Sequence, residues 1–174
     1  MVEIRLANHD DFQNVQGFYY ALIEEMSHLE YTPRWEKDVY PTSEFLSDSI
    51  ENKELYIGEI DGQIASVMVV NHSYNEGYKE IKWQVKAEDT ELFVIHALGV
   101  RYELAGKGIA KEMVRKVIET ARAMNLKAIR LDVLAGNTPA ERVYLKMGFR
   151  YLETIHMFYA DTGWTEFKLY EYVV

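Results

Sequence analysis

A nearly uninterrupted apolar run, Glu91–Val100, stands shortly before the most regular amphipathic pattern of the chain. Such a run is typical of a strand that is covered on both faces of a sheet. In the segment that follows, apolar residues recur at three- and four-residue spacing, which predicts a helix with one buried face. These residues are Ile109, Ala110, Met113, Val114, Val117, Ile118 and Ala121. A covered strand followed by such a helix favours an α/β architecture.

The other segments alternate between strand and helix patterns in the same way. Asp61-Gly62 is a strong two-residue hairpin signal, and Asp161-Thr162-Gly163 marks a second turn. We predict strands in 2–7, 91–100 and 127–135, and two each in 54–74 and 149–174. We predict helices in 10–29, 43–52, 109–126 and 137–147, with Asn8 and Asn137 as N-caps and Pro139 in the last helix's first turn. The order β-α-α-β-β-β-α-β-α-β-β indicates a sheet of mixed direction.

Composition limits the classes of function. The 174 residues fit a single domain, 1–174, and no apolar stretch reaches membrane-spanning length. The first residues also lack the pattern of a signal peptide. The chain has no cysteine, which excludes disulfides, thiolate metal sites and a cysteine nucleophile and favours a cytoplasmic location. A formal net charge of −9 argues against nucleic-acid binding; it indicates either solubility or a cationic small partner.

Two glycines, Gly106 and Gly108, stand at the entrance of the helix that begins near Ile109. Glycine weakens a helix, so this pair indicates either turn geometry or a group that approaches the backbone closely. A helix N-terminus suits phosphate, because its first N–H groups are unpaired and carry partial positive charge. The P-loop pattern is absent, and the dinucleotide fingerprint fails at Lys111, where its third glycine would stand.

The segments "LGVRYELAGKGIA" and "NTPAERVYLKMGF", with the hairpin that follows, resemble the Gcn5-related N-acetyltransferase (GNAT) superfamily. The resemblance covers most of the chain and is strongest between Val94 and Leu152. It implies a central mixed, mostly antiparallel sheet flanked by helices and splayed between its fourth and fifth strands. It also implies acetyl-CoA as co-substrate, without a metal.

The same resemblance implies an N-acetyltransferase that moves acetyl to a primary amine of a small molecule or peptide. The amine would attack directly in a ternary complex. The alternative is a non-catalytic acyl-CoA-binding or sensor domain on the same fold. No nucleic-acid or membrane partner is expected, and a homodimer stays possible.

The family's acetyl-CoA motif, [RQ]-x-x-G-x-[GA], corresponds here to a loop in which Ala105 replaces the usual Arg or Gln. This replacement removes one side-chain contact but none of the backbone N–H groups. The resemblance implies that the cofactor contacts Ala105, Gly106, Lys107, Gly108, Ile109 and Ala110 in this loop and Asn137 at the pantetheine arm. It further implies that Leu98, Gly99 and Val100 line the splayed gap, with an amide near Leu98 polarising the thioester carbonyl. Gly99 suits a bulged or closely approached position.

Tyr144 matches the tyrosine that, in the family, protonates the leaving thiolate. A thiol has a pKa of about 8.5 and a phenol one of about 10, so the phenol stays protonated at neutral pH and can donate. The alternative is a tyrosine that only packs on the last helix.

His96 is the candidate base, because imidazole with a pKa of about 6.5 accepts a proton near neutral pH. Strand alternation predicts that it shares a face with Leu98 and Val100, and a member of the superfamily resembles this chain in carrying a catalytic histidine in that strand. The alternatives are a buried histidine with satisfied hydrogen bonds and a water chain to an acidic residue.

The acceptor is expected under the loop 30–42, which in the family covers the substrate. Tyr31, Trp35 and Tyr40 can form an aromatic wall for a cation or an apolar chain. Acidic residues of this loop can attract an amine; they are Glu30, Glu36 and Asp38. Trp83 is a further candidate, and simple packing of the aromatic loop is the alternative.

Overall fold

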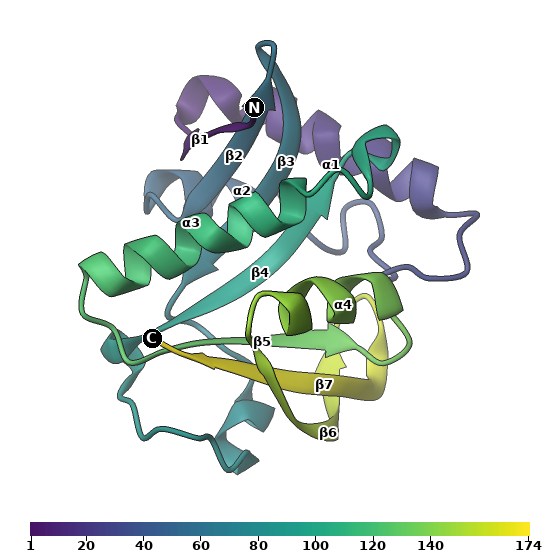
Figure 1. Cartoon of the computed structure of the whole chain (residues 1–174). Coiled ribbons are helices and arrows are strands. Elements are labelled where there is room, and N and C mark those ends of the chain that lie inside the picture. Colours follow the sequence, from purple (N-terminus) through teal and green to yellow (C-terminus); the bar gives the residue numbers. More distant parts are fainter.

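The computed structural model describes all residues, 1–174, and contains one seven-stranded sheet of order β1-β2-β3-β4-β5-β7-β6 (Figure 1). The strands are β1 (Glu3–Leu6), β2 (Leu55–Ile60), β3 (Gln63–Asn71), β4 (Leu92–Val100), β5 (Ala128–Leu134), β6 (Arg150–Tyr159) and β7 (Gly163–Val173). The helices are α1 (Phe12–Met26), α2 (Ser43–Glu51), α3 (Ile109–Ala123) and α4 (Thr138–Lys146). The predicted element order and the mixed α/β sheet flanked by helices are confirmed.

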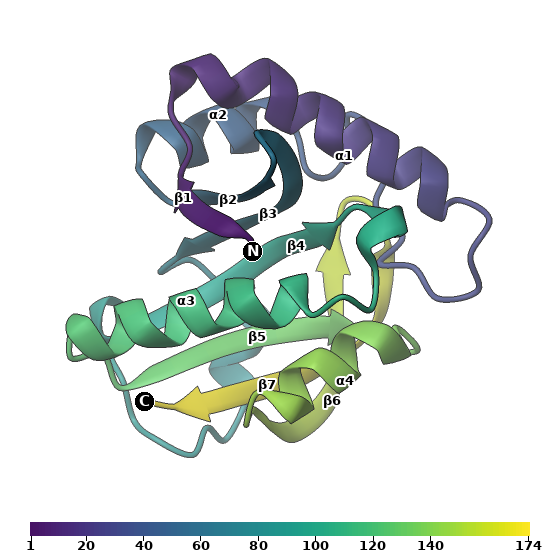
Figure 2. The same ribbon diagram turned by 45° about the horizontal axis from the view of Figure 1, so that its top comes forward.

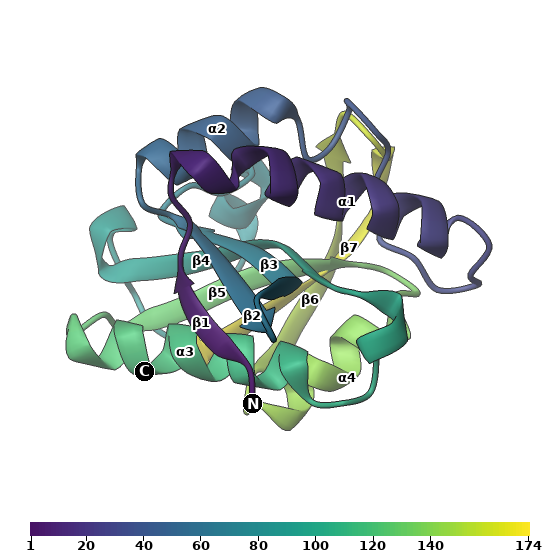
Figure 3. The same cartoon turned by 90° about the horizontal axis from the view of Figure 1, so that it is seen from above.

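The helices cover the two faces of the sheet in pairs. Figure 3 shows α1 and α2 on one side and α3 and α4 on the other. The α3 side holds a core cluster of 18 buried residues and the α1 side one of 13. A third cluster of 9 buried residues packs beneath the segment between β3 and β4. No helix is long and apolar enough to cross a membrane.

Helix ends differ from the predicted ones in detail. Asn8 does cap, but it caps a short 3-10 turn, His9–Asp11, from which α1 continues. The α3 helix ends at Ala123, and Asn125 has a left-handed φ of 55°, which stops the helix before the predicted residue 126. Asn137 stands at the N-cap position of α4, but its side chain makes no hydrogen bond to the helix. Asn137 is therefore the N-cap residue by position, as predicted, but its side chain does not cap the helix.

The sheet is splayed where β4 and β5 meet, as predicted. These two strands form the one parallel pair of the sheet, in the register Leu92–Ala128, Phe93–Ile129 and Val94–Arg130. Beyond Val94 the pairing stops, although β4 runs on to Val100 and β5 to Leu134. Figure 1 shows the two strands diverging towards the end beside α4. The divergence leaves their carboxyl ends open to a ligand.

A β-bulge in β4 interrupts the alternation of its side chains. Val69 pairs with His96 and Val67 with Gly99, so Ala97 and Leu98 lie opposite the single residue Met68. Ala97 has a φ of 52°, a left-handed conformation that is unfavourable for a residue with a Cβ. The buried Tyr19 of α1 donates a hydrogen bond of 2.6 Å from its hydroxyl to the Ala97 carbonyl. This bond holds the strained residue in place.

Tyr19→Phe is expected to lower the free energy of unfolding by about 1–3 kcal/mol, because it leaves a buried carbonyl without its donor. Urea denaturation measures this loss. The control is Tyr20→Phe, since Tyr20 bonds Asp38 at the exposed surface and a smaller change is expected there. Equal losses in both variants would contradict a role of the Tyr19 hydroxyl at the bulge.

Candidate active site

A cavity of about 560 Å³ lies in the gap between β4 and β5. The end of β4, the loop before α3, the end of β5, α4, the segment between α1 and α2, and the β6–β7 turn all contribute to its lining. Figures 2 and 3 show the last two of these segments side by side near the ends of β4 and β5. The residues predicted to bind the cofactor, to catalyse or to form the aromatic wall all line this cavity except Lys107, which is exposed.

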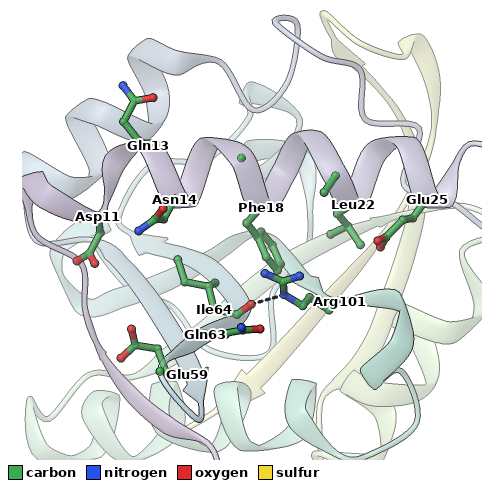
Figure 4. A pocket seen from close by; sticks show the side chains of 13 residues that line it. Asp11, Gln13, Asn14, Phe18, Leu22, Glu25, Glu59, Gln63, Ile64 and Arg101 are labelled. Atoms are coloured by element: carbon green, nitrogen blue, oxygen red, sulfur yellow. Dashed lines mark hydrogen bonds between the residues drawn. The ribbon is translucent and has the colours of Figure 1, made fainter.

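A second hollow, of about 370 Å³, lies between α1 and the β2–β3 hairpin (Figure 4). Its lining contains none of the predicted site residues. Arg101 crosses its floor and donates to the Ile64 carbonyl, and Asp11 and Glu59 are both paired with Arg5. The carboxylates of Asp11 and Glu59 are therefore already paired within the fold. The cavity between β4 and β5 is the better candidate for an active site, because the predicted catalytic residues line it.

The glycine loop before α3 presents unpaired backbone donors. Gly106 has a φ of 78° and Gly108 one of 85°, conformations that glycine adopts without strain. A Cβ added at either position would meet no atom within 4 Å, so the space beside the backbone is open. The amide N–H groups that have no acceptor in the chain are those of Gly106, Gly108, Ile109, Ala110 and Lys111. Unpaired N–H groups at a helix N-terminus form a site for phosphate oxygens.

Residues near this loop extend the same lining. The Asn137 side chain lines the cavity with no hydrogen bond to its own helix, so its amide is available to a ligand. Leu98 and Val100 pack on the α3 side of the sheet. Of the two alternatives predicted for Gly99, the close approach is the one found: a Cβ there would lie 2.6 Å from Leu22 Cδ2, whereas the bulge is at Ala97. The glycine at 99 therefore admits the close approach of α1.

Tyr144 is 7% exposed and packs edge-on against Phe149, with the ring centroids 5.5 Å apart. Its hydroxyl makes no hydrogen bond in the chain, and no buried polar side-chain atom lacks a partner, so this hydroxyl opens onto the cavity. Burial, with a smaller contribution from the charge of Asp132, raises the pKa of Tyr144. The phenol is thus a protonated group that faces the ligand space.

His96 lies on the other face of the sheet from Leu98 and Val100, so the prediction of a shared face is wrong. The extra residue at the bulge reverses the alternation, and the His96 ring packs 6.4 Å from that of Phe45 on α2. It still lines the cavity, because β4 has no β5 partner there and the cavity reaches both faces.

The hydrogen bonds of His96 fix its tautomer. Its Nε2 lies 3.0 Å from the Ser73 carbonyl and 2.9 Å from Asn71 Oδ1. A carbonyl oxygen can only accept, so Nε2 carries the proton and the neutral ring keeps its lone pair on Nδ1. Burial lowers the pKa of His96 to about 4, against a smaller opposing effect of the Ser73 bond. The ring is therefore neutral, and Nδ1 can accept a proton, at pH 7.

The aromatic residues predicted for the acceptor form a connected wall. Trp35 lies between Tyr19 and Tyr40, with ring centroids 5.7 and 6.4 Å away, and Tyr40 contacts Phe45. Tyr31 is 46% exposed and lines the mouth. The acidic residues suggested for the same loop lie outside the lining; they are Glu30, Glu36 and Asp38.

Trp83 also lies outside the cavity. Its indole N–H donates to the Tyr78 carbonyl, and its ring lies 4.3 Å from the Arg130 guanidinium carbon. Arg130 in turn pairs with the buried Glu171. Trp83 therefore packs over a buried ion pair and has no contact with the ligand space.

Sequence reasoning missed several residues that line the cavity, among them Asp132, Tyr159 and Asp161. Asp132, at the end of β5, accepts hydrogen bonds from the Tyr78 and Tyr159 hydroxyls at 2.7 and 2.8 Å. Burial raises the pKa of the carboxyl groups of Asp132 and Asp161. A signal for Asp132 was present, since it is the one acidic residue in the apolar strand "AIRLDVL". No group of three or more His, Asp or Glu side chains is placed to hold a metal ion.

Comparisons with known proteins agree with this geometry. A solved GNAT-family acetyltransferase from Streptococcus agalactiae 2603 superposes with a TM-score of 0.81 at 20% identity, over 99% of this chain and 95% of that one. Arabidopsis thaliana NAA60, solved in complex with acetyl-CoA, superposes with a TM-score of 0.71 at 20% identity, over the full length of both chains. These likenesses establish the fold.

Sequence comparison identifies the family. Mycothiol acetyltransferase of Corynebacterium glutamicum is 36% identical over 75 residues, which are 43% of this chain and 25% of that protein. The match thus spans about a quarter of the length of that relative. Residues 20–149, most of the chain, match the sequence model of the acetyltransferase (GNAT) family. The glycine loop, the splayed strands and this match lead to one conclusion: the chain belongs to the acetyltransferase (GNAT) family.

Proposed function

We propose that residues 1–174 form a single domain that transfers acetyl from acetyl-CoA to a primary amine of a small molecule or peptide. The observation that carries the proposal is one cavity onto which both the five unpaired N–H groups at the N-terminus of α3 and the free hydroxyl of Tyr144 open. The first feature suits a pyrophosphate, and the second suits a leaving thiolate.

The residues on the α3 and α4 side of the cavity bind acetyl-CoA. The five unpaired N–H groups between Gly106 and Lys111, which exclude that of Lys107, bind the pyrophosphate, and the Asn137 amide bonds the pantetheine arm. Leu98, Gly99 and Val100 flank the arm along the open edge of β4. Ala105 supplies no side-chain contact, so the backbone of the loop carries the phosphate binding.

The chemistry needs an electrophile, a base and an acid. An amide near Leu98 donates to the thioester carbonyl oxygen and polarises it. His96 Nδ1, directly or through a water, accepts the proton of the attacking amine as the C–N bond forms. Tyr144 donates its proton to sulfur as the C–S bond breaks, so thiol and amide leave as neutral products.

Release of free thiol on addition of acetyl-CoA to a panel of primary amines tests this function. We expect thiol release that depends on the amine. Binding of acetyl-CoA without thiol release for every amine would favour the sensor alternative.

Gly108→Glu is expected to weaken acetyl-CoA binding by at least about 10-fold, since each charge-assisted hydrogen bond lost costs about 1.5–3 kcal/mol. The new side chain puts bulk and negative charge where the pyrophosphate binds. Calorimetry with acetyl-CoA measures the change.

Gly62→Glu is the matched control for this substitution. Gly62 has a similar φ of 75° and equally open surroundings, but it lies in the β2–β3 turn outside the active-site cavity. Glutamate at position 62 should therefore cause a backbone strain comparable to that at position 108. Because Gly62 lies outside the cavity, the acetyl-CoA affinity of Gly62→Glu should equal that of the wild type. Unchanged affinity in a folded Gly108→Glu protein would refute the assignment of the phosphate site.

A further inference from the structure

The charged residues that line the active-site cavity are segregated by sign. The basic ones stand on α3 and α4, at the end assigned to acetyl-CoA; they are Lys111, Arg142 and Lys146. The acidic ones are Asp132 at the end of β5 and Asp161 in the β6–β7 turn. Opposite fields at the two ends favour an anionic ligand at one and a cationic ligand at the other.

Asp132 presents a fixed carboxyl group to the cavity, and its two hydrogen bonds offset part of the rise in its pKa that burial causes. The two phenols of Tyr78 and Tyr159 donate to the same oxygen, Oδ2, and fix the orientation of the carboxylate. The other oxygen, Oδ1, accepts no hydrogen bond from the chain and is not sealed from the cavity. A fixed carboxylate with one free oxygen is an acceptor for an ammonium group.

Aromatic side chains line the cavity together with Asp132 and Asp161. They are Trp35, Tyr40 and Tyr159, and burial, followed by smaller effects that include the charges of both carboxyl groups, raises the pKa of Tyr159. Aromatic faces add to the binding of a cation in a partly desolvated site. The Tyr144 hydroxyl, in a side chain more than nine-tenths buried and without a partner, opens onto the same cavity. Its free hydroxyl marks the reacting end of the bound molecules.

The reacting amine and the carboxylates have opposite requirements. An amine must be neutral to attack, whereas a neighbouring carboxylate favours the charged ammonium form. The neutral His96 Nδ1 suits the reacting amine, so the carboxylates suit a second nitrogen that stays charged. Resting on the function proposed above, we infer that the acceptor is a compact diamine-type molecule whose second, cationic nitrogen is bound by Asp132 and Asp161.

The test compares 1,4-diaminobutane with 1-aminobutane, which offer the same primary amine with and without the second cation. We expect kcat/KM for thiol release to be about 10- to 150-fold higher for the diamine, the range of one charge-assisted hydrogen bond. Asp132→Asn and Asp161→Asn should each move this ratio towards one, because kcat/KM falls more for the diamine than for 1-aminobutane. Glu3→Gln, which removes an exposed carboxylate on β1 outside the cavity, should leave the ratio intact.

Calorimetric titration of 1,4-diaminobutane into the protein with coenzyme A separates this inference from acetyl transfer itself. Binding that weakens in both Asp variants supports the cation site even if no amine is acetylated. Equal turnover of the two amines, with no measurable diamine binding, would overturn the inference and leave amine acetylation standing. A loss of 1-aminobutane turnover in Asp132→Asn equal to that for the diamine would assign Asp132 to proton transfer and also overturn it.

Discussion

Tyr144→Phe is expected to lower kcat by about 10²- to 10⁴-fold, the usual contribution of a general acid. The substitution keeps the ring that packs on Phe149 and removes the hydroxyl that opens onto the cavity. Without that proton the sulfur must leave as a thiolate. Because the hydroxyl makes no hydrogen bond in the fold, stability and acetyl-CoA affinity should change little. Steady-state thiol release and calorimetry measure the two quantities.

Tyr151→Phe is the matched control for this prediction. Tyr151 is 44% exposed on β6, and its hydroxyl pairs with Thr154. Its loss should leave kcat at the wild-type value. If kcat of Tyr144→Phe also stayed within a few-fold of wild type, Tyr144 would be a packing residue, and solvent would protonate the leaving group.

The contribution of Tyr144 to kcat depends on how burial acts on its phenol. Burial raises the pKa of its phenol, which keeps the proton on oxygen throughout the neutral range. The thioester sulfur is a very poor proton acceptor and becomes basic, with a thiol pKa of about 8.5, only as the C–S bond breaks. Proton donation is therefore coupled to bond cleavage.

The sequence predicts the fold well because its signals are local. The apolar run of β4, the helical spacing in α3 and the Asp61-Gly62 turn each lie within one element, and each element forms as expected. The glycine loop was predictable for the same reason, since the φ values of Gly106 and Gly108 are local properties.

Other features of the site could not be predicted because they depend on contacts between distant segments. The bulge at Ala97 uses a non-glycine residue in a left-handed conformation, held by Tyr19, 78 residues earlier. The bulge places His96 on the face of the sheet opposite to the one that simple strand alternation predicts. Asp132 and Asp161 meet the cavity through β5 and the β6–β7 turn, whose proximity follows from the strand order β5-β7-β6.

His96→Gln is expected to lower kcat by about 10²-fold or more and to alter its pH dependence. The imidazole has a pKa of about 4, so the wild-type kcat should be independent of pH above about 5 and fall below it as Nδ1 becomes protonated. Glutamine can keep an N–H donor for the Ser73 carbonyl but has no basic nitrogen. The variant should therefore lose the acid limb as well as the rate. Profiles of kcat at saturating amine exclude the ionisation of free acceptor from the measurement.

The same variant has a distinct signature in stability. The folded-state pKa of about 4 lies below the ordinary value of 6.5, so between these pH values the unfolded chain binds a proton that the folded protein does not. The contribution of neutral His96 to stability is complete above pH 6.5 and is lost as pH falls, by at most about 1.4 kcal/mol per pH unit. His96→Gln should lose this acid sensitivity, measured by urea denaturation at pH 4.5, 5.5 and 7. If the acid sensitivity disappeared while kcat and its pH profile stayed at wild type, His96 would be a buried structural residue. Because Glu30, Glu36 and Asp38 lie outside the cavity lining, solvent or Asp132 would then be left to take the proton.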